Sequence, residues 1–371
     1  MKFIIKEKRI QNNTKAIFVQ RKNICKIKNK DKSNKSSFTK QELTDPLFLQ
    51  KLLEKTNSKI LKMFEIKDYI DSGSESIVYK IIEKNTRKPL IMKIIYRKNN
   101  EKRNINEFQI SRKLKNKNIS NFYGVEEIKE LNLDCVITDY AKLNDLSYFL
   151  KKINKKYLSE SMLCFFAYQI LKGLYFCHLN KIAHFDIKPK NIVIDQFLNL
   201  KIIDFSVSLD YSNINKNKIE LPFQGTNFYI SPEVIKKKVI NVKDINKVDL
   251  YSFGVLLYNL AFGSYPYGLT SDDSKDYDKI YYKIQNEKLE FNKKLCYSSY
   301  FIEFLSRLLE KDINKRININ EALNHYWIKC SNILLDEKEK LNNIPIFLLY
   351  LLTNHIINFN LAINKNLNFI E

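Results

Sequence analysis

Two short segments near the middle of the chain bring together side chains that could position a phosphoryl group. The segment 184–191, HFDIKPKN, contains a carboxylate at Asp186, an ammonium group at Lys188 and an amide oxygen at Asn191. A second carboxylate, Asp204, follows thirteen residues after Asn191. Asn191 and Asp204 are hard oxygen donors at the two ends of a predicted hairpin, so both can reach one small cation such as Mg²⁺. Phosphoryl transfer needs these parts: oxygen ligands for a metal, a fixed cation and a base beside the acceptor hydroxyl.

The elements that must position these residues change in type along the chain. Short apolar runs predict strands in the first part, and residues 104–115 suit a helix. Beyond residue 150 helical spacing dominates, beginning with a long helix that Ser159 can cap. A strand-rich part followed by a helix-rich part predicts two lobes with the ligand site between them. The predicted strands of the first part are 64–70, 77–82, 90–95 and 134–138.

The same two segments resemble motifs of the eukaryotic protein kinase family. HFDIKPKN resembles the catalytic loop H-R-D-L-x-x-x-N, and Asp204-Phe205-Ser206 resembles D-F-G. The resemblance extends over residues 64–330 and implies an ATP-dependent serine/threonine kinase that uses Mg²⁺, with Mn²⁺ as an alternative. It implies that Asp186 orients and deprotonates the substrate hydroxyl while Lys188 steadies the γ-phosphate. Asn191 and Asp204 would hold the metal.

In the first lobe the resemblance implies a nucleotide site. Ile91-Met92-Lys93 resembles the V-A-I-K strand, which makes Lys93 the cation for the α- and β-phosphates, and Glu107 resembles its partner on the next helix. A buried lysine needs such a partner because an unpaired buried charge is costly. Thr138 would be the gatekeeper, followed by a hinge whose backbone meets adenine. The other nucleotide-binding residues that the resemblance implies are Ile70, Gly73, Val78, Asp139, Ala141 and Asp145. For Asp145, a ribose contact and a plain helix cap both stay open.

The glycine-rich loop departs from the family pattern. In place of G-x-G-x-x-G the chain has Asp71-Ser72-Gly73-Ser74-Glu75-Ser76, which keeps the middle glycine. Glycine lets backbone amides close on phosphates, whereas Asp71 and Glu75 add negative charge beside a polyanion. The loop therefore predicts weaker ATP binding than in a relative with all three glycines.

Three further departures bear on regulation and specificity. Phe185 replaces an arginine that grips a phosphate on the activation segment in many relatives, so we expect activity without phosphorylation of that segment. The hydroxyl residues available there are Ser208, Tyr211, Ser212 and Thr226. Ser206 replaces the glycine of D-F-G, and a side chain disfavours positive φ. Lys190 replaces a glutamate that attracts substrate arginine, which favours an acidic or neutral substrate context.

Later motifs resemble the scaffold of the second lobe. Residues 225–233 resemble the end of a kinase activation segment, and Asp249 begins a segment similar to D-x-x-S-x-G. The resemblance implies that Asp249 braces the catalytic loop and that Arg316 pairs with Glu233. These roles are structural.

The net charge of +22 is distributed unevenly. Residues 1–40 hold thirteen Lys or Arg against Glu7 and Asp31. This basic arm is either a solvated tail or a docking segment for an acidic partner or membrane surface.

Six scattered cysteines and four histidines predict neither a disulfide framework nor a zinc site. The apolar stretch 344–357 is too short to span a bilayer and predicts a helix packed on the domain, with a peripheral membrane contact as the alternative. We expect no signal peptide, no transmembrane segment and no nucleic-acid partner. The expected location is intracellular, in the cytoplasm, with the nucleus as an alternative.

Together these observations predict an α+β protein of the bilobal protein-kinase fold, with a small β-rich N-lobe containing one main helix and a larger helical C-lobe. Residues 1–60 are expected to form a disordered basic extension, 61–330 the kinase domain and 331–371 a helical tail. Within the domain the N-lobe is predicted at 61–138, the hinge at 139–142 and the C-lobe at 143–330. The partners are ATP and a protein substrate. A pseudokinase or scaffold is the first alternative, and a small-molecule or lipid kinase is the second.

Overall fold

The computed structural model describes residues 41–56, 58, 61–73, 76–96, 103–153, 157–292, 295 and 297–329, without the side chains of 103–106. Three predictions therefore lie outside the described residues: the basic arm at 1–40, the helical tail at 331–371 with its apolar stretch 344–357, and the tip of the glycine-rich loop at Ser74 and Glu75.

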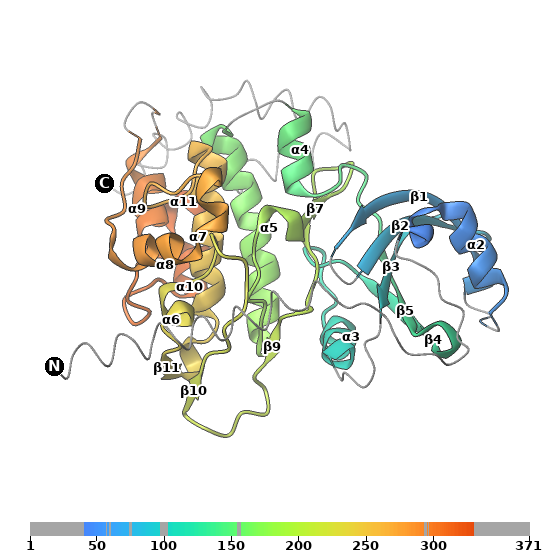
Figure 1. Cartoon of the computed structure of the whole chain (residues 1–371). Helices are drawn as coiled ribbons and strands as arrows, with labels where there is room; N and C mark the ends of the chain where they lie inside the picture. Colours follow the sequence, from blue (N-terminus) through green and yellow to red (C-terminus); the bar gives the residue numbers. More distant parts are fainter. Residues whose placement is uncertain are drawn as a thin grey trace. The chain divides into compact units, whose positions relative to one another are not determined.

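A five-stranded antiparallel sheet forms the N-lobe (Figure 1). Its strands lie in the order β1-β2-β3-β5-β4, and helix α3 (Arg103–Lys113) follows β3 in the chain. Lys93 pairs with Val78 on one side and with Val136 on the other, so these residues share one face of the sheet. The neighbouring residues Tyr79 and Met92 are buried on the opposite face. The strands are β1 (Phe64–Ser72), β2 (Ser76–Glu83), β3 (Pro89–Tyr96), β4 (Phe122–Ile128) and β5 (Leu133–Asp139), with a 3-10 turn η4 (Lys129–Leu131) before β5.

Helix α2 (Pro46–Glu54), which was not predicted from the sequence, covers the opposite face of the sheet. Residues η2 (Glu42–Thr44) and α2 lie inside the predicted disordered extension, and that prediction was wrong for them. Leu49 and Leu53 are buried, one helical turn apart, and the Tyr79 hydroxyl donates to the Leu43 carbonyl. The helix forms because Asp45 caps it, accepting from the Leu47 amide at 2.9 Å, and Pro46 occupies its first position.

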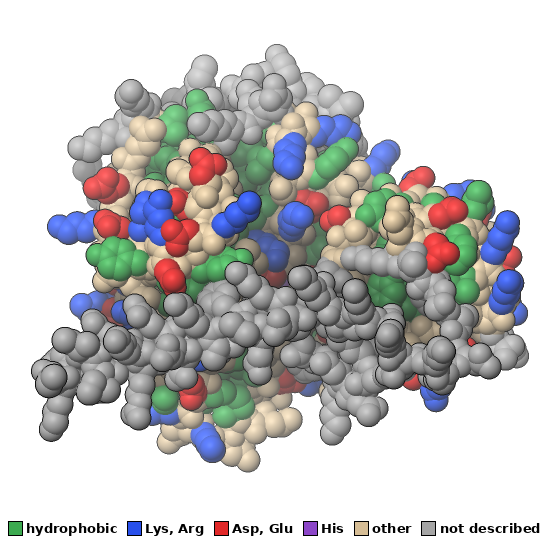
Figure 2. Space-filling view, viewed as in Figure 1, with side chains coloured by type: hydrophobic (Ala, Val, Ile, Leu, Met, Phe, Trp, Pro, Cys, Tyr) green, Lys and Arg blue, Asp and Glu red, His purple; other side chains and the backbone are tan. Residues whose placement is uncertain are grey.

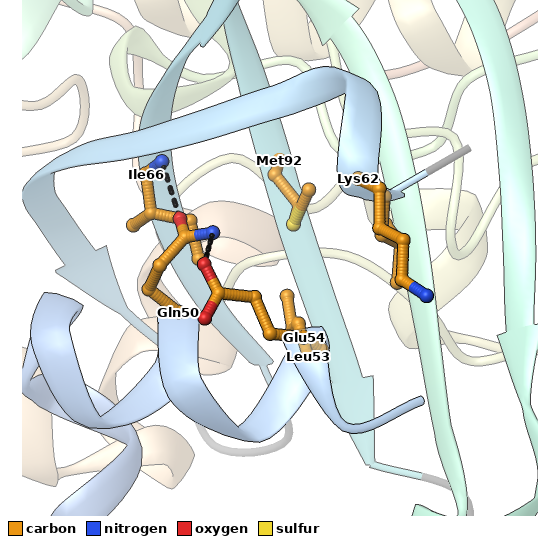
Figure 3. A pocket seen from close by; sticks show the side chains of 7 residues that line it. Gln50, Leu53, Glu54, Lys62, Ile66 and Met92 are labelled. Carbon is orange, nitrogen blue, oxygen red and sulfur yellow. Dashed lines mark hydrogen bonds between the residues drawn. The ribbon is translucent and has the colours of Figure 1, made fainter. Parts of the chain in front are cut away.

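A small pocket lies where α2 meets the sheet (Figure 3). Gln50 accepts a hydrogen bond from the Ile66 amide of β1 at 3.0 Å and donates to Glu54 at 3.0 Å. Met92 of β3 and Lys62 of the turn η3 (Leu61–Met63) also line the pocket. The side chain of Gln50 thus fastens α2 to the first strand of the lobe.

We expect the buried face of α2 to contribute to the stability of the N-lobe. Leu49→Ala should lower the free energy of unfolding by about 2–5 kcal/mol because it removes a fully buried side chain. Leu47→Ala, on the same helix but 73% exposed, is the matched control and should cost less than about 0.5 kcal/mol. Urea unfolding followed by circular dichroism measures both values. Equal effects of the two substitutions would show that α2 is not packed as described.

The C-lobe is mainly helical and has one apolar core. Two central helices, α5 (Glu160–Leu179) and α7 (Lys247–Phe262), are buried over most of their length. Helix α5 is long and apolar enough to cross a membrane, but 72% of its apolar window is buried inside the fold, as in a core helix. The other helices are α4 (Leu146–Lys152), α6 (Pro232–Ile235), α8 (Tyr277–Asn286), α9 (Ser299–Leu308), α10 (Ile319–Asn324) and α11 (Tyr326–Lys329), with 3-10 turns η6 (Val242–Asp244) and η7 (Ser271–Lys275).

Three two-stranded ribbons in the C-lobe position the predicted catalytic segments. The predicted hairpin is confirmed as β7 (Ile192–Ile194) and β8 (Leu200–Ile202), with Ile192 opposite Ile202. Strand β6 (Ile182–Ala183) pairs with β9 (Leu209–Asp210), and β10 (Lys218–Glu220) pairs with β11 (Val239–Asn241). The strand-rich part and the helical part agree with the predicted bilobal α+β fold.

Candidate active site

The loop between β6 and β7 brings Asp186, Lys188 and Asn191 together. Lys188 donates from Nζ to Asp186 Oδ2 at 2.6 Å, and Asn191 donates from Nδ2 to the same oxygen at 3.0 Å and to the Asp186 carbonyl at 2.8 Å. Asn191 ends the 3-10 turn η5 (Pro189–Asn191), which Pro189 begins. The three side chains therefore form one cluster around the predicted base.

Thr226 completes this cluster, although we did not predict it as a site residue. Its hydroxyl donates to Asp186 Oδ1 at 2.6 Å and accepts from Lys188 Nζ at 2.8 Å. The only sequence signal was its place in the segment 225–233, which resembles the end of a kinase activation segment. Thr226 thereby links that segment to the predicted base and cation.

A buried aspartate holds the catalytic loop from the first turn of α7. Asp249 accepts from the backbone amides of His184 at 2.9 Å and Phe185 at 2.8 Å, and it contacts His178 Nε2 at 2.9 Å. Phe185 has a φ of 65°, a left-handed conformation that costs energy for a residue other than glycine. The two hydrogen bonds to Asp249 offset that cost, and the predicted bracing role of Asp249 is confirmed.

Lys93 connects the two lobes through two carboxylates. Its Nζ atom lies 3.3 Å from Glu107 Oε1 on α3 and 3.0 Å from Asp204 Oδ1 beyond β8. Burial acts to lower the pKa of Lys93, but Glu107 and Asp204 outweigh it and raise that pKa above its ordinary value. Burial raises the pKa of Glu107, against the attraction of Lys93. Burial also acts to raise the pKa of Asp204, yet the Lys93 ammonium overrides it and lowers that pKa to about 2.

The residues that would hold Mg²⁺ fit a hard cation. The Ile203 amide donates to the Asn191 carbonyl at 3.0 Å, which fixes Asn191 beside the strand end that precedes Asp204. Asn191 uses Nδ2 for both donations to Asp186, so its Oδ1 is the amide atom that can serve as a ligand. Asp204 is ionised at neutral pH because of its low pKa. An amide oxygen and a carboxylate are the donor types that Mg²⁺ and Mn²⁺ accept.

The predicted nucleotide-binding residues lie on β1, β2 and the chain after β5. Val78 is half-buried on the sheet face of Lys93, and Ile70 lies at an irregularity in the pairing of β1 with β2. Thr138 and Ala141 are half-buried at the end of β5 and just after it. Asp145 accepts from the Tyr148 amide at 2.9 Å and caps α4, which agrees with the helix-cap alternative. A ribose contact by Asp145 stays a prediction.

The side chain of Asp139 has a structural partner that the sequence did not reveal. Its carboxylate accepts from Lys201 Nζ on β8 at 2.6 Å and from the Tyr123 hydroxyl on β4 at 2.8 Å. Burial acts to raise the pKa of Asp139, but these donors lower it. The predicted hinge therefore begins at an ion pair that joins the N-lobe sheet to the strand preceding Asp204.

The remaining loop glycine lies between the end of β1 and the start of β2. The Gly73 amide donates to the Ser76 carbonyl at 2.9 Å, and the Asp71 carboxylate accepts from the Ser72 amide at 2.8 Å.

Ser76→Gly should tighten ATP binding about fivefold, because a loop with a second glycine can close further on the phosphates and add about one net hydrogen bond of ~1 kcal/mol. Fluorescence titration with a nucleotide analogue measures the dissociation constant. An unchanged constant, together with an affinity typical of all-glycine loops, would contradict this expectation.

Charges of both signs are interspersed over the face of the described residues that Figure 2 shows. Exposed ion pairs also occur among the described residues, such as Arg307 with Glu303 at 3.6 Å. In the buried core of the C-lobe, Arg316 pairs with Glu233 through two bonds of 2.7 and 2.9 Å, as predicted.

Comparison with known proteins agrees with this geometry. The family model "Protein kinase domain" matches residues 64–328. The chain is 29% identical to serine/threonine-protein kinase pakH of Dictyostelium discoideum over 271 residues, covering 72% of this chain and 50% of that protein. It is 29% identical to the Aurora kinase of the same organism over 272 residues, covering 72% and 66%.

A plant relative gives a similar result. The CBL-interacting serine/threonine-protein kinase 12 of Arabidopsis thaliana is 27% identical over 294 residues, covering 78% of this chain and 57% of that protein. The chain thus spans between half and two thirds of the length of these relatives. Because the family match covers most of the chain and coincides with the lysine, carboxylate and amide clusters described above, the chain belongs to the protein kinase family.

Proposed function

We propose that the chain is an active kinase that transfers the γ-phosphate of ATP to serine and threonine hydroxyls of proteins. The observation that carries this proposal is the position of Lys93, which bonds both Glu107 at 3.3 Å and Asp204 at 3.0 Å. Kinases require the lysine–glutamate pair and the metal-binding aspartate to be in place together. None of the departures at Ser76, Phe185 and Ser206 removes the lysine, the base or the metal ligands.

In this proposal the chain's own residues supply positioning and proton transfer. Asp186 accepts the proton of the substrate hydroxyl as the new O–P bond forms and the bond between the γ-phosphorus and the β–γ bridging oxygen of ATP breaks, with ADP as the leaving group. Lys188, 2.6 Å from Asp186, stabilises the charge on the transferred group. Lys93 binds the non-transferred phosphates. Asn191 and Asp204 would hold Mg²⁺, which neutralises charge on the phosphates when bound.

The choice of serine and threonine rests on the second lobe. Lys188 stands two residues after Asp186, a position that resembles the serine/threonine type, and it donates to the Thr226 hydroxyl at 2.8 Å. Two of the relatives described above are named serine/threonine kinases. Lys190 is exposed beside this cluster, and we expect it to disfavour arginine in the substrate.

Phosphosite profiling tests the proposal. The purified full chain is incubated with ATP, Mg²⁺ and a dephosphorylated peptide library from a cell lysate, in parallel with its Asp204→Ala variant. We expect phosphoserine and phosphothreonine in neutral or acidic contexts with the native chain alone. Enrichment of arginine before the acceptor would contradict the predicted specificity.

A pseudokinase or scaffold is the second candidate, favoured by the departures from the family pattern at Asp71, Ser76, Phe185 and Ser206. It predicts equal phosphate incorporation by the native chain and the Asp204→Ala variant. That result would overturn the proposed activity.

A further inference from the structure

The segment between Asp204 and Glu233, the activation segment, is fastened to the C-lobe along its length. Near its start β9 pairs with β6, and the Tyr211 amide donates to the Lys181 carbonyl at 2.9 Å. In its middle β10 pairs with β11, and near its end Thr226 bonds to Asp186.

The side chain of Phe185 is part of the apolar core of the C-lobe, at a position where many relatives carry an arginine. Its side chain is buried, and its carbonyl lies against Gly225 of the activation segment. A Cβ added to Gly225 would stand 2.7 Å from the Phe185 carbonyl oxygen, and Gly225 has a φ of 109°. The catalytic loop and the activation segment therefore pack directly on each other, with no receptor for a phosphate at Phe185.

An ion pair joins the activation segment to the helix that carries Glu107. Lys113, the last residue of α3, donates from Nζ to Asp210 Oδ2 at 2.5 Å. The other oxygen of Asp210 accepts from the Ser212 amide at 3.0 Å and hydroxyl at 2.6 Å. These two bonds from Ser212 fix the orientation of the Asp210 carboxylate toward Lys113, and the Asp210 side chain is only 18% exposed. Its pKa is lowered because hydrogen bonds from Lys113 and Ser212 outweigh burial.

Resting on the proposed function, we propose that Lys113 and Asp210 are positioning residues whose ion pair replaces a phosphate as the link between α3 and the activation segment. Lys113 follows Glu107 by less than two helical turns, about 9 Å along the axis. Fixing this end of α3 holds Glu107 close to Lys93. The carboxylate of Asp210 supplies the negative charge that phosphorylation supplies elsewhere.

The hydroxyl groups of the activation segment support this assignment. Ser208 is buried and donates to the His184 carbonyl at 3.1 Å, Tyr211 is buried, and Thr226 bonds to Asp186 and Lys188. A phosphate on any of them would break contacts that shape the site. Tyr229 and Ser231 are buried as well. Ser206 and Ser212 are exposed, but a phosphate on either would meet a carboxylate, that of Asp204 or that of Asp210.

Charge removal and charge exchange test the link. We expect Lys113→Met and Asp210→Asn each to lower kcat on dephosphorylated casein about three- to fivefold, the scale of a partly exposed ion pair. KM for casein should stay within twofold, because the pair does not contact the substrate cluster. The double exchange Lys113→Asp with Asp210→Lys should restore at least half of the native kcat. Phosphatase treatment of the native chain should leave kcat unchanged.

The matched control is Lys279→Met, which removes an ion pair of the same length. Lys279 lies 2.5 Å from Asp273, and both Lys279 and Lys113 are 48% exposed. The Lys279→Met variant should have the native kcat, while its melting temperature should change as much as that of Lys113→Met. Unchanged kcat in both single variants, or no recovery in the exchange variant, would overturn the inference.

Hydrogen exchange of the α3 amides separates this inference from the proposed function. Lys113→Met should speed exchange at residues 107–113 at least threefold, and Lys279→Met should not. If the native chain shows no kinase activity but Lys113→Met still speeds hydrogen exchange in α3, the proposed kinase activity is wrong and the link is supported. Unchanged exchange and unchanged kcat in an active chain would sink the link alone.

Discussion

Replacing Asp186 by asparagine is expected to lower kcat about 10³-fold while leaving ATP binding nearly unchanged. The carboxylate is the proposed base, and loss of a positioned base costs on the order of 10²–10⁴ in rate. Asparagine has a similar shape but cannot accept the proton. Lys93, Glu107 and Asp204 do not contact residue 186 directly, and the bond from Asn191 to the backbone carbonyl of residue 186 is kept in the variant. The dissociation constant for ATP should therefore stay within about twofold of the native value.

Asp195→Asn is the matched control for this prediction. Asp195 lies in the turn between β7 and β8 and accepts from the amides of Phe197 at 2.8 Å and Asn199 at 2.9 Å. Asparagine can accept the same hydrogen bonds, so kcat should be unchanged. Steady-state phosphate transfer to casein and fluorescence titration of ATP give the two constants. A variant of Asp186 that keeps more than a tenth of the native kcat would rule out its role as base.

The residues that could be predicted from sequence lie in short motifs. Asp186, Lys188 and Asn191 lie within six residues, and their hydrogen bonds are local. The hairpin that separates Asn191 from Asp204 was also readable, because its two apolar runs flank a polar turn. Lys93 and Asp204 are far apart in the chain. The family resemblance placed both at one nucleotide site, but their direct contact was not predicted.

The contacts that could not be predicted join residues with no motif of their own. Lys201 and Lys113 are two of 63 basic residues, and nothing near them in sequence marks Asp139 or Asp210 as their partners. These pairs meet because the fold brings Lys201 of β8 to the end of β5 and the end of α3 to Asp210 of β9. Helix α2 was missed for a related reason, because its buried leucines, Leu49 and Leu53, follow a long lysine-rich stretch that resembles a tail.

The largest expected effect on stability is at Arg316, deep in the C-lobe. Arg316→Met should lower the free energy of unfolding by about 3–5 kcal/mol, because it leaves Glu233 as a buried charge without its partner. The guanidinium is fully buried and also donates to the carbonyls of Lys247 at 2.9 Å and Glu310 at 2.8 Å. The N–H groups of this guanidinium therefore connect α6, at the end of the activation segment, to the start of α7 and to the chain before α10.

Arg307→Met is the control for the loss at Arg316, since it removes a partly exposed arginine that pairs with Glu303 at 3.6 Å. It should cost less than about 1 kcal/mol, because both side chains stay largely in water. Adding Glu233→Gln to Arg316→Met should recover part of the stability, since the unpaired buried charge is then gone. Urea unfolding by tryptophan fluorescence reports the core directly, because Trp327 is fully buried against Phe301 and Phe304. Equal losses for Arg316→Met and Arg307→Met would mean that the buried pair does not hold α6 in place.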